Sequence, residues 1–152
     1  MILQIVKSPN PRLKRVCIPA DFRKGDQRIL ARRLIETMKA HKAYGIAANQ
    51  VTPGPLVRII AVTTKEYVGA MFNPEILKKL GGIISEKETC LSLKGEYPVP
   101  RIQQIEVSFR NIAGEARTIV FEGLGAIVVQ HEIDHLNGVL ASDYFDSAPE
   151  IS

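Results

Sequence analysis

The segment QHEIDHLNG, residues 130–138, carries two histidines at helical spacing with a glutamate directly after the first. On an α-helix, residues four apart lie on the same face, so His131 and His135 can direct ring nitrogens at one metal ion. Residues 124–138 contain no lysine or arginine, so we expect a buried helix rather than a solvated one. Two ordinary histidines in a chance pattern are the alternative. Because a buried, unpaired imidazole pair is costly, we interpret the segment as a metal-binding helix.

A third metal ligand must come from outside this helix, since catalytic zinc-type sites use three protein ligands and keep a fourth position for water. Downstream, the candidates are the carboxylates Asp143, Asp146 and Glu150 near the chain end. Upstream, Cys90 in ETCLS offers a thiolate, which is a strong ligand for a borderline or soft divalent ion. Cys17 is expected to be an ordinary buried thiol. On ligand chemistry we favour Cys90 over the acidic tail.

Glu132 supplies a second function beside the ligands. It follows His131 and therefore points to a different side of the helix, close enough to reach a metal-bound water without ligating the ion. A metal lowers the pKa of its water, and a carboxylate can take the proton and pass it to a leaving amine. The alternative is a plain surface carboxylate. With the histidines as ligands, the pattern predicts amide hydrolysis.

Length and composition place the chain among globular proteins. Its 152 residues, 45% of them hydrophobic, are enough for one core, so we expect a single domain spanning residues 1–152. No apolar run is long enough to cross a bilayer, and the N-terminus lacks the features of a secretory signal. Two cysteines cannot form a disulfide framework. We therefore expect a cytoplasmic protein that does not bind membranes.

The elements that must position these residues follow from hydrophobic periodicity. A first amphipathic helix begins at Asp26, a plausible N-cap, and ends before Gly45. Strands are predicted over residues 56–62 and 67–72, with a further apolar segment after Asn73-Pro74, and a hairpin over residues 102–110 and 117–123. The last helix runs from Leu124 to Gly138. This order predicts an α+β fold with antiparallel or mixed sheets packed around the C-terminal helix that carries HEIDH.

Three segments together resemble the motifs of the peptide deformylase family: YGIAANQ (residues 44–50), ETCLS (residues 88–92) and QHEIDHLNG (residues 130–138). They stand in the family's order and spacing, and the resemblance covers nearly the whole chain. It implies a metal-dependent hydrolase that removes the formyl group from the N-terminal formyl-methionine of newly made polypeptides and releases formate.

The resemblance also implies a role for each matched position. The metal ligands would be Cys90, His131 and His135; Glu132 would be the general base and acid; Gln50 and the backbone N–H of Leu91 would face the formyl oxygen. The ion would be Fe²⁺, replaceable by Zn²⁺, Ni²⁺ or Co²⁺. Substrate backbone would pair along Tyr44 and Gly45. The methionine pocket would be walled by Leu124, Ile127 and Val128, for which plain core packing is the alternative.

Two positions depart from the family pattern, because Ala43 and Thr89 stand where glycine is usual. If either backbone needed positive φ, the side chain would cost about 1 kcal/mol or more; otherwise it would only narrow the cleft. The departures keep open a protein that binds metal or formylated peptides without turnover, and a third ligand other than Cys90 would indicate a different metal-dependent amidase.

The resemblance is to compact members without a C-terminal helix, as carried by some bacterial viruses. We therefore expect a monomer in a bacterial cell, an infected host or an organelle. The net charge is +4, and the basic residues between Lys7 and Arg58 make a weak candidate for contact with the ribosome, although a solvated helix face is the more usual role. No motif for specific nucleic-acid sequences is present.

Overall fold

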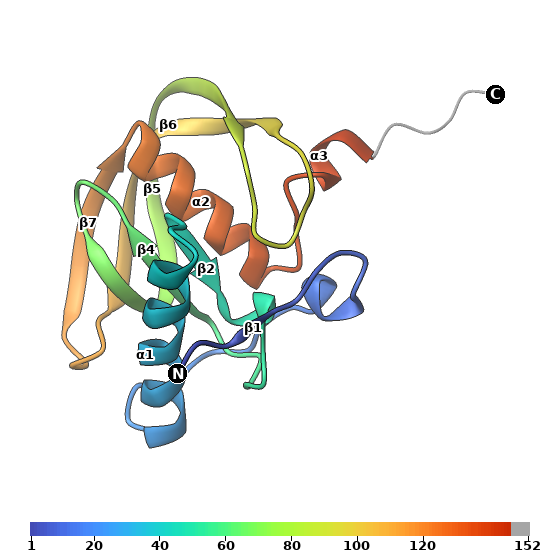
Figure 1. The fold of residues 1–152 in the computed structure, drawn as a ribbon. Helices are drawn as coiled ribbons and strands as arrows, with labels where there is room; N and C mark the ends of the chain where they lie inside the picture. Colours follow the sequence, from blue (N-terminus) through green and yellow to red (C-terminus); the bar gives the residue numbers. More distant parts are fainter. Residues whose placement is uncertain (147–152) are drawn as a thin grey trace.

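The chain folds into two main helices and seven strands in a computed structural model that describes residues 1–146 (Figure 1). The helices are α1 (Gly25–Ala40), α2 (Leu124–Leu136) and α3 (Asp143–Asp146), with 3-10 turns η1 (Pro11–Lys14) and η2 (Ala48–Gln50). The strands are β1 (Gln4–Ile5), β2 (Gly45–Ala47), β3 (Val51–Thr52), β4 (Ile59–Thr63), β5 (Val68–Glu88), β6 (Tyr97–Arg110) and β7 (Ala116–Glu122).

Five of the strands form one antiparallel sheet in the order β2-β4-β5-β6-β7, and β1 pairs with β3 in a second, two-stranded sheet. Figure 1 shows β5 and β6 as the longest strands, with α2 lying against the sheet. The predicted α+β class with antiparallel sheets is confirmed. Because β2 is an edge strand, one side of its backbone has no strand partner within residues 1–146.

Strand β4 separates two hydrophobic clusters. Ile60 and Val62 pack with residues of α2, whereas Ile59 and Ala61 pack with residues of α1. Successive side chains of a strand point to opposite faces, so the two helices cover opposite faces of the sheet at β4. Eleven of the thirteen residues of α2 are buried, which confirms the prediction of a buried helix.

The predicted limits of α1 are wrong at both ends. Lys24, not Asp26, is the N-cap, without a side-chain hydrogen bond, and Asp26 lies in the first turn. Gly45 does not end the helix but begins β2. The chain leaves the helix earlier because Lys42, with φ of 52°, adopts the left-handed conformation.

The strands also differ from the prediction in extent. The strand expected from residue 56 begins at Ile59, and the hairpin is confirmed with a longer first strand. β5 does not stop at Phe72 but continues through Pro74, where the pairing register with β6 shifts between Phe72 and Glu75. Such a bulge leaves a residue unpaired, so a proline without a backbone N–H is tolerated there.

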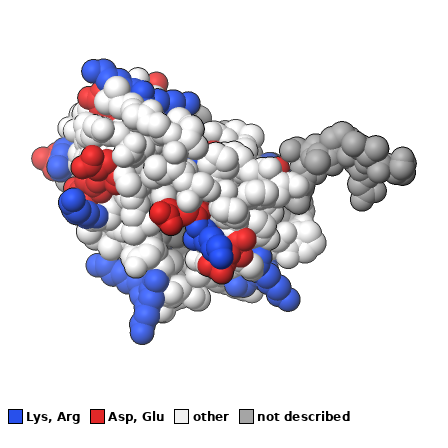
Figure 2. Space-filling view, turned by 90° about the horizontal axis from the view of Figure 1, so that it is seen from above, with Lys and Arg blue, Asp and Glu red and all other residues white. Residues whose placement is uncertain are grey.

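Most of the face seen in Figure 2 is uncharged, and charged side chains of both signs are scattered over it. Lysine and arginine alternate with aspartate and glutamate on this face, without one continuous basic surface. Among the described residues, no helix has the length and apolar character needed to span a membrane.

Candidate metal centre

Three predicted ligand atoms converge at the C-terminal half of α2. The helix brings the Nε2 atoms of His131 and His135 to 3.1 Å from each other. Cys90, in the loop that follows β5, places its Sγ 3.5 Å from Nε2 of His135. Within residues 1–146, these three residues form the one group of three that could hold a metal ion, with ligand atoms within 4.8 Å of one another.

Two of the three separations between the ligand atoms fit a single tetrahedral ion. With metal–nitrogen bonds of about 2.0–2.1 Å, two nitrogens lie about 3.3–3.4 Å apart, and a nitrogen and a thiolate sulfur somewhat further. The observed separations of 3.1 and 3.5 Å are close to these values. Of the other ligand candidates, Asp143 pairs with Lys14 and Cys17 is packed in the core. The side chain of Asp146 and the whole of Glu150 lie outside the described part of the chain.

The ring of His131 is held from behind by a buried carboxylate. Glu88, the last residue of β5, places Oε1 2.8 Å from His131 Nδ1. Arg101 of β6 donates two hydrogen bonds to Glu88, of 2.8 and 2.9 Å, and a third of 2.6 Å to Asp134. A carboxylate on Nδ1 fixes the tautomer that leaves Nε2 free for a metal.

Charges in this cluster shift the pKa values of its members. Burial acts to raise the pKa of Glu88, yet the hydrogen bonds from Arg101 and His131 lower it below its ordinary value. Burial acts to lower the pKa of His131, but hydrogen bonds to Cys90 and Glu88 raise it to about 10. Burial, followed by the charges of His131 and Arg101, lowers the pKa of His135 well below its ordinary value. These opposite shifts favour the additional proton on His131 and a neutral His135, and an ion bound by both rings would displace that proton.

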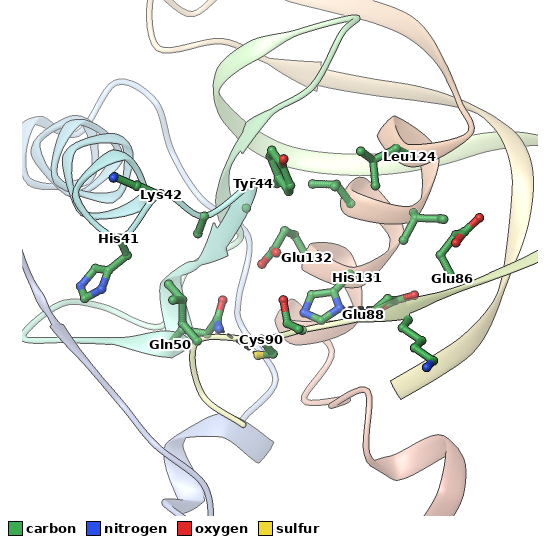
Figure 3. A pocket seen from close by; sticks show the side chains of 17 residues that line it. His41, Lys42, Tyr44, Gln50, Glu86, Glu88, Cys90, Leu124, His131 and Glu132 are labelled. Carbon is green, nitrogen blue, oxygen red and sulfur yellow. Dashed lines mark hydrogen bonds and ion pairs between the residues drawn. The ribbon is translucent and has the colours of Figure 1, made fainter. Parts of the chain in front are cut away.

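Glu132 is buried beside the ligands. The residue is 4% exposed, and its Oε1 has no hydrogen-bond partner among the described residues. Burial raises the pKa of this carboxyl to about 7. In Figure 3 its carboxylate projects from α2 toward β2, on the side of His131 where Gln50 lies. A carboxylate so placed can exchange a proton near neutral pH.

Gln50 and Leu91 border the same space. The side-chain oxygen of Gln50 accepts a hydrogen bond from the backbone N–H of Ala47 at 2.9 Å. This contact directs the side-chain nitrogen of Gln50 to Ser92 Oγ at 3.2 Å and to Cys90 Sγ at 3.5 Å. The backbone N–H of Leu91 donates to no protein group within residues 1–146. The N–H of Leu91 is thus a donor without a protein partner among the described residues, and the Gln50 amide nitrogen lies next to the ligand Cys90.

A cavity of about 400 Å³ opens onto these groups (Figure 3). The predicted substrate-binding residues all line it, together with the polar groups; they are Tyr44, Gly45, Leu124, Ile127, Val128, Gln50, Cys90, Leu91, His131 and Glu132. Ile127 and Val128 are buried walls, whereas Leu124, 58% exposed, stands at the mouth.

Ala43 and Thr89 also line the cavity. Neither is among the described residues with positive φ, so their side chains cause no backbone strain of that kind. As expected for positions that do not need positive φ, their side chains only narrow the cavity that they line.

Several residues of the site were not predicted from the sequence. Glu88 and Asp134 stand inside the motif segments, but no local rule pairs them with Arg101. The sequence feature that could have identified Arg101 is a positive charge within an otherwise apolar stretch of β6. In the fold, Arg101 is 3% exposed. The cavity mouth also contains four residues that were not predicted, which are His41, Lys42, Glu86 and Lys87.

The sequence also matches a family model and known proteins over most of its length. A family model described as Polypeptide deformylase matches residues 2–150. The peptide deformylase of Afipia carboxidovorans is 39% identical over 147 residues, which cover 94% of this chain and 86% of the relative. That of Dictyoglomus turgidum is 39% identical over 146 residues, covering 94% and 92%.

Solved structures show the same fold. A class I type b peptide deformylase from Acinetobacter baumannii, crystallised with the ligand K2U, has a TM-score of 0.86 and 32% identity, covering 94% of this chain and 99% of that one. The enzyme of the Vibrio parahaemolyticus bacteriophage VP16T, in complex with actinonin, has a TM-score of 0.84 and 31% identity, covering 91% and 99%.

Proposed function

The chain belongs to the polypeptide deformylase family, and we propose that Cys90, His131 and His135 hold its metal ion while Glu132 transfers the proton. The protein is an enzyme that removes the formyl group from the N-terminal formyl-methionine of newly made polypeptides and releases formate. The observation that carries the assignment of residues is the convergence of one sulfur and two imidazole nitrogens beside a buried carboxylate.

We propose Fe²⁺ as the native ion, with Zn²⁺ or Ni²⁺ able to replace it. A thiolate and two imidazoles form a ligand set that suits any of these borderline ions. When bound, the ion lowers the pKa of a water molecule and polarises the formyl carbonyl.

Glu132 then acts as base and acid. Its carboxylate accepts a proton from the attacking water, and a pKa near 7 lets it return that proton to the departing amine nitrogen. The C–N bond of the formyl amide breaks and formate leaves. The amide of Gln50 and the N–H of Leu91 donate hydrogen bonds to the formyl oxygen as it gains negative charge.

The cavity and the sheet edge place the substrate. Leu124, Ile127 and Val128 surround the methionine side chain, since an apolar wall suits a thioether. The peptide backbone pairs with the free edge of β2 at Tyr44 and Gly45, as an added strand.

We further propose that residues 1–152 act as one catalytic domain, monomeric, in the cytoplasm of a bacterium or of an infected bacterial host, with an organelle as the alternative. Contact with the ribosome would use the basic residues between Lys7 and Arg58 and be electrostatic, hence weakened by salt.

Formate release from formyl-Met-Ala-Ser by protein purified without oxygen tests the assignment of Glu132. We expect one metal ion per chain in the wild type and in Glu132→Gln, with formate produced by the wild type alone. Release at the wild-type rate by Glu132→Gln would contradict the role of this residue.

The choice of ligands and of metal has its own test. Cys90→Ala is expected to lose the ion, and Cys17→Ala, the matched control, to retain it; the reverse would overturn the ligand choice. Because a thiolate on Fe²⁺ is prone to oxidation, the iron enzyme should lose activity in air while the nickel or zinc enzyme keeps it. Equal stability of the iron and nickel forms in air would contradict oxidation of iron at a thiolate ligand.

A further inference from the structure

A continuous chain of polar contacts joins the metal ligand His131 to helix α3. Glu88 holds His131 Nδ1 at 2.8 Å and is itself held by Arg101. The Nη1 of Arg101 donates to Oδ2 of Asp134 at 2.6 Å, and the hydroxyl of Tyr144 donates to the same oxygen at 2.7 Å. Three side chains, each hydrogen-bonded to the next, thus lie between Tyr144 of α3 and the ion-binding ring of His131.

The outer end of this chain lies nearer to solvent than the inner end. Arg101 is 3% exposed, whereas the side chain of Asp134 is 23% and Tyr144 is 42% exposed. A partly exposed carboxylate can turn into water and leave its partner unless a second contact holds it. Tyr144 provides that contact, and its ring also lies 5.3 Å from the Arg101 guanidinium carbon.

We propose that Tyr144 is a positioning residue for the metal, acting through Asp134, Arg101 and Glu88 on the ring of His131. The inference rests on the proposed metal site. Removing the hydroxyl would free Asp134 to move, loosen Arg101, and allow Glu88 and the His131 ring to depart from the orientation that points Nε2 at the ion. Burial and the hydrogen bond to Asp134 raise the pKa of Tyr144 to about 12, which keeps the phenol protonated as a donor.

Loss of the Tyr144 hydroxyl should leave α3 in place, because other contacts also hold this helix. Asp143 pairs with Lys14 and accepts from the backbone N–H of Leu140 at 2.8 Å. The variant Tyr144→Phe keeps the ring and these anchors and deletes one hydroxyl. It therefore tests the polar chain without removing the helix from the fold.

Cobalt binding to the metal-free protein provides the test, with chelator competition for the dissociation constant and the visible spectrum of bound Co²⁺ for the geometry. Direct partners of metal-bound histidines change affinity by about 10- to 100-fold, so a residue further out should change it by about three- to tenfold. We expect Tyr144→Phe to weaken binding by this factor and to shift the spectrum. Tyr97→Phe is the matched control. The Tyr97 hydroxyl donates to the backbone carbonyl oxygen of Lys94 at 2.9 Å and takes no part in the polar contacts that lead to His131.

Asp134→Asn extends the test to the residue between Tyr144 and Arg101. If the effect passes through this carboxylate, adding Tyr144→Phe to Asp134→Asn should weaken cobalt binding no further. Wild-type affinity and spectrum in Tyr144→Phe, equal losses in Tyr144→Phe and Tyr97→Phe, or additive losses in the double variant would each overturn the inference. Failure of the wild type itself to bind Co²⁺ would instead overturn the metal site on which the inference rests.

Discussion

The carboxylate of Glu132 fills the space that a side chain at Gly45 would occupy. A Cβ built on Gly45 would lie 2.5 Å from Glu132 Oε2 and 2.8 Å from its Cδ. A Cβ is essentially never found within 3 Å of another atom, so the Glu132 carboxylate would have to shift if the strand carried a side chain here. Gly45 therefore determines where the proposed base stands.

Gly45→Ala should lower activity without removing the metal. The added methyl group displaces Glu132, and proton transfer by a positioned side chain contributes about 10²- to 10⁴-fold to rate, so we expect kcat/KM for formyl-Met-Ala-Ser to fall about 100-fold. Gly82→Ala is the control, since nothing lies within 4 Å of its added Cβ. A Gly45→Ala enzyme as active as Gly82→Ala would show that this contact does not place the base.

Glu132→Gln should stabilise the metal-free protein at neutral and alkaline pH but not at acidic pH. Burial raises the pKa of Glu132 from 4.5 to about 7, so the folded protein holds this proton more tightly than the unfolded chain. Its contribution to stability is fully present below pH 4.5 and is lost as pH rises through about 7. A shift of this size corresponds to on the order of 3 kcal/mol.

Urea unfolding of both metal-free proteins measures this difference. At pH 8 the variant should exceed the wild type in free energy of unfolding by about this amount, and near pH 4.5 the two should converge. A constant difference across the range would mean that Glu132 ionises normally in the folded protein.

The sequence predicts those parts of the site that depend on one element or on ligand chemistry. The helical period places His131 and His135 on one face, because residues four apart meet on any helix. Cys90 could be named because a thiolate suits a borderline divalent ion better than a carboxylate does. Gly45 was interpreted as a helix stop, since a glycine after an amphipathic segment usually is one.

Contacts between distant segments could not be predicted in this way. The approach of Gly45 to Glu132 depends on how α2 packs against β2. The pairing of Arg101 with Glu88 and Asp134 depends on the register of β5 and β6, which is shifted by bulges at three places. The continuation of β5 through Pro74 contradicts strand propensity and follows from pairing with β6.

Arg101→Met should destabilise the fold strongly. It would leave Glu88 and Asp134 without their cation, and breaking a buried ion pair costs about 3–5 kcal/mol. Arg117→Met, on an exposed residue of β7, should change the free energy of unfolding by less than about 0.5 kcal/mol. Adding Glu88→Gln to Arg101→Met should recover part of the loss in urea unfolding. A loss below about 1 kcal/mol for Arg101→Met would contradict the buried network.

Val128→Phe should separate a pocket wall from a core residue. Val128 is 8% exposed and lines the cavity beside the metal ligands, so a phenyl ring there would occupy the room proposed for the methionine side chain. Overpacking costs about 1–3 kcal/mol, which lowers stability for either role. A pocket wall, however, discriminates between substrates, and small changes in apolar fit are worth about 10- to 200-fold.

The ratio of kcat/KM for formyl-Met-Ala-Ser to that for formyl-Ala-Ala-Ser should therefore fall about tenfold or more in Val128→Phe. Val120→Phe is the control, because Val120 lies on β7 and is 43% exposed. This change should leave the ratio unchanged. The ratio cancels any loss of folded protein, because both substrates report on the same active fraction. If Val128→Phe lowers both rates equally, Val128 belongs to the core alone, and the methionine side chain must be held by other walls of the cavity.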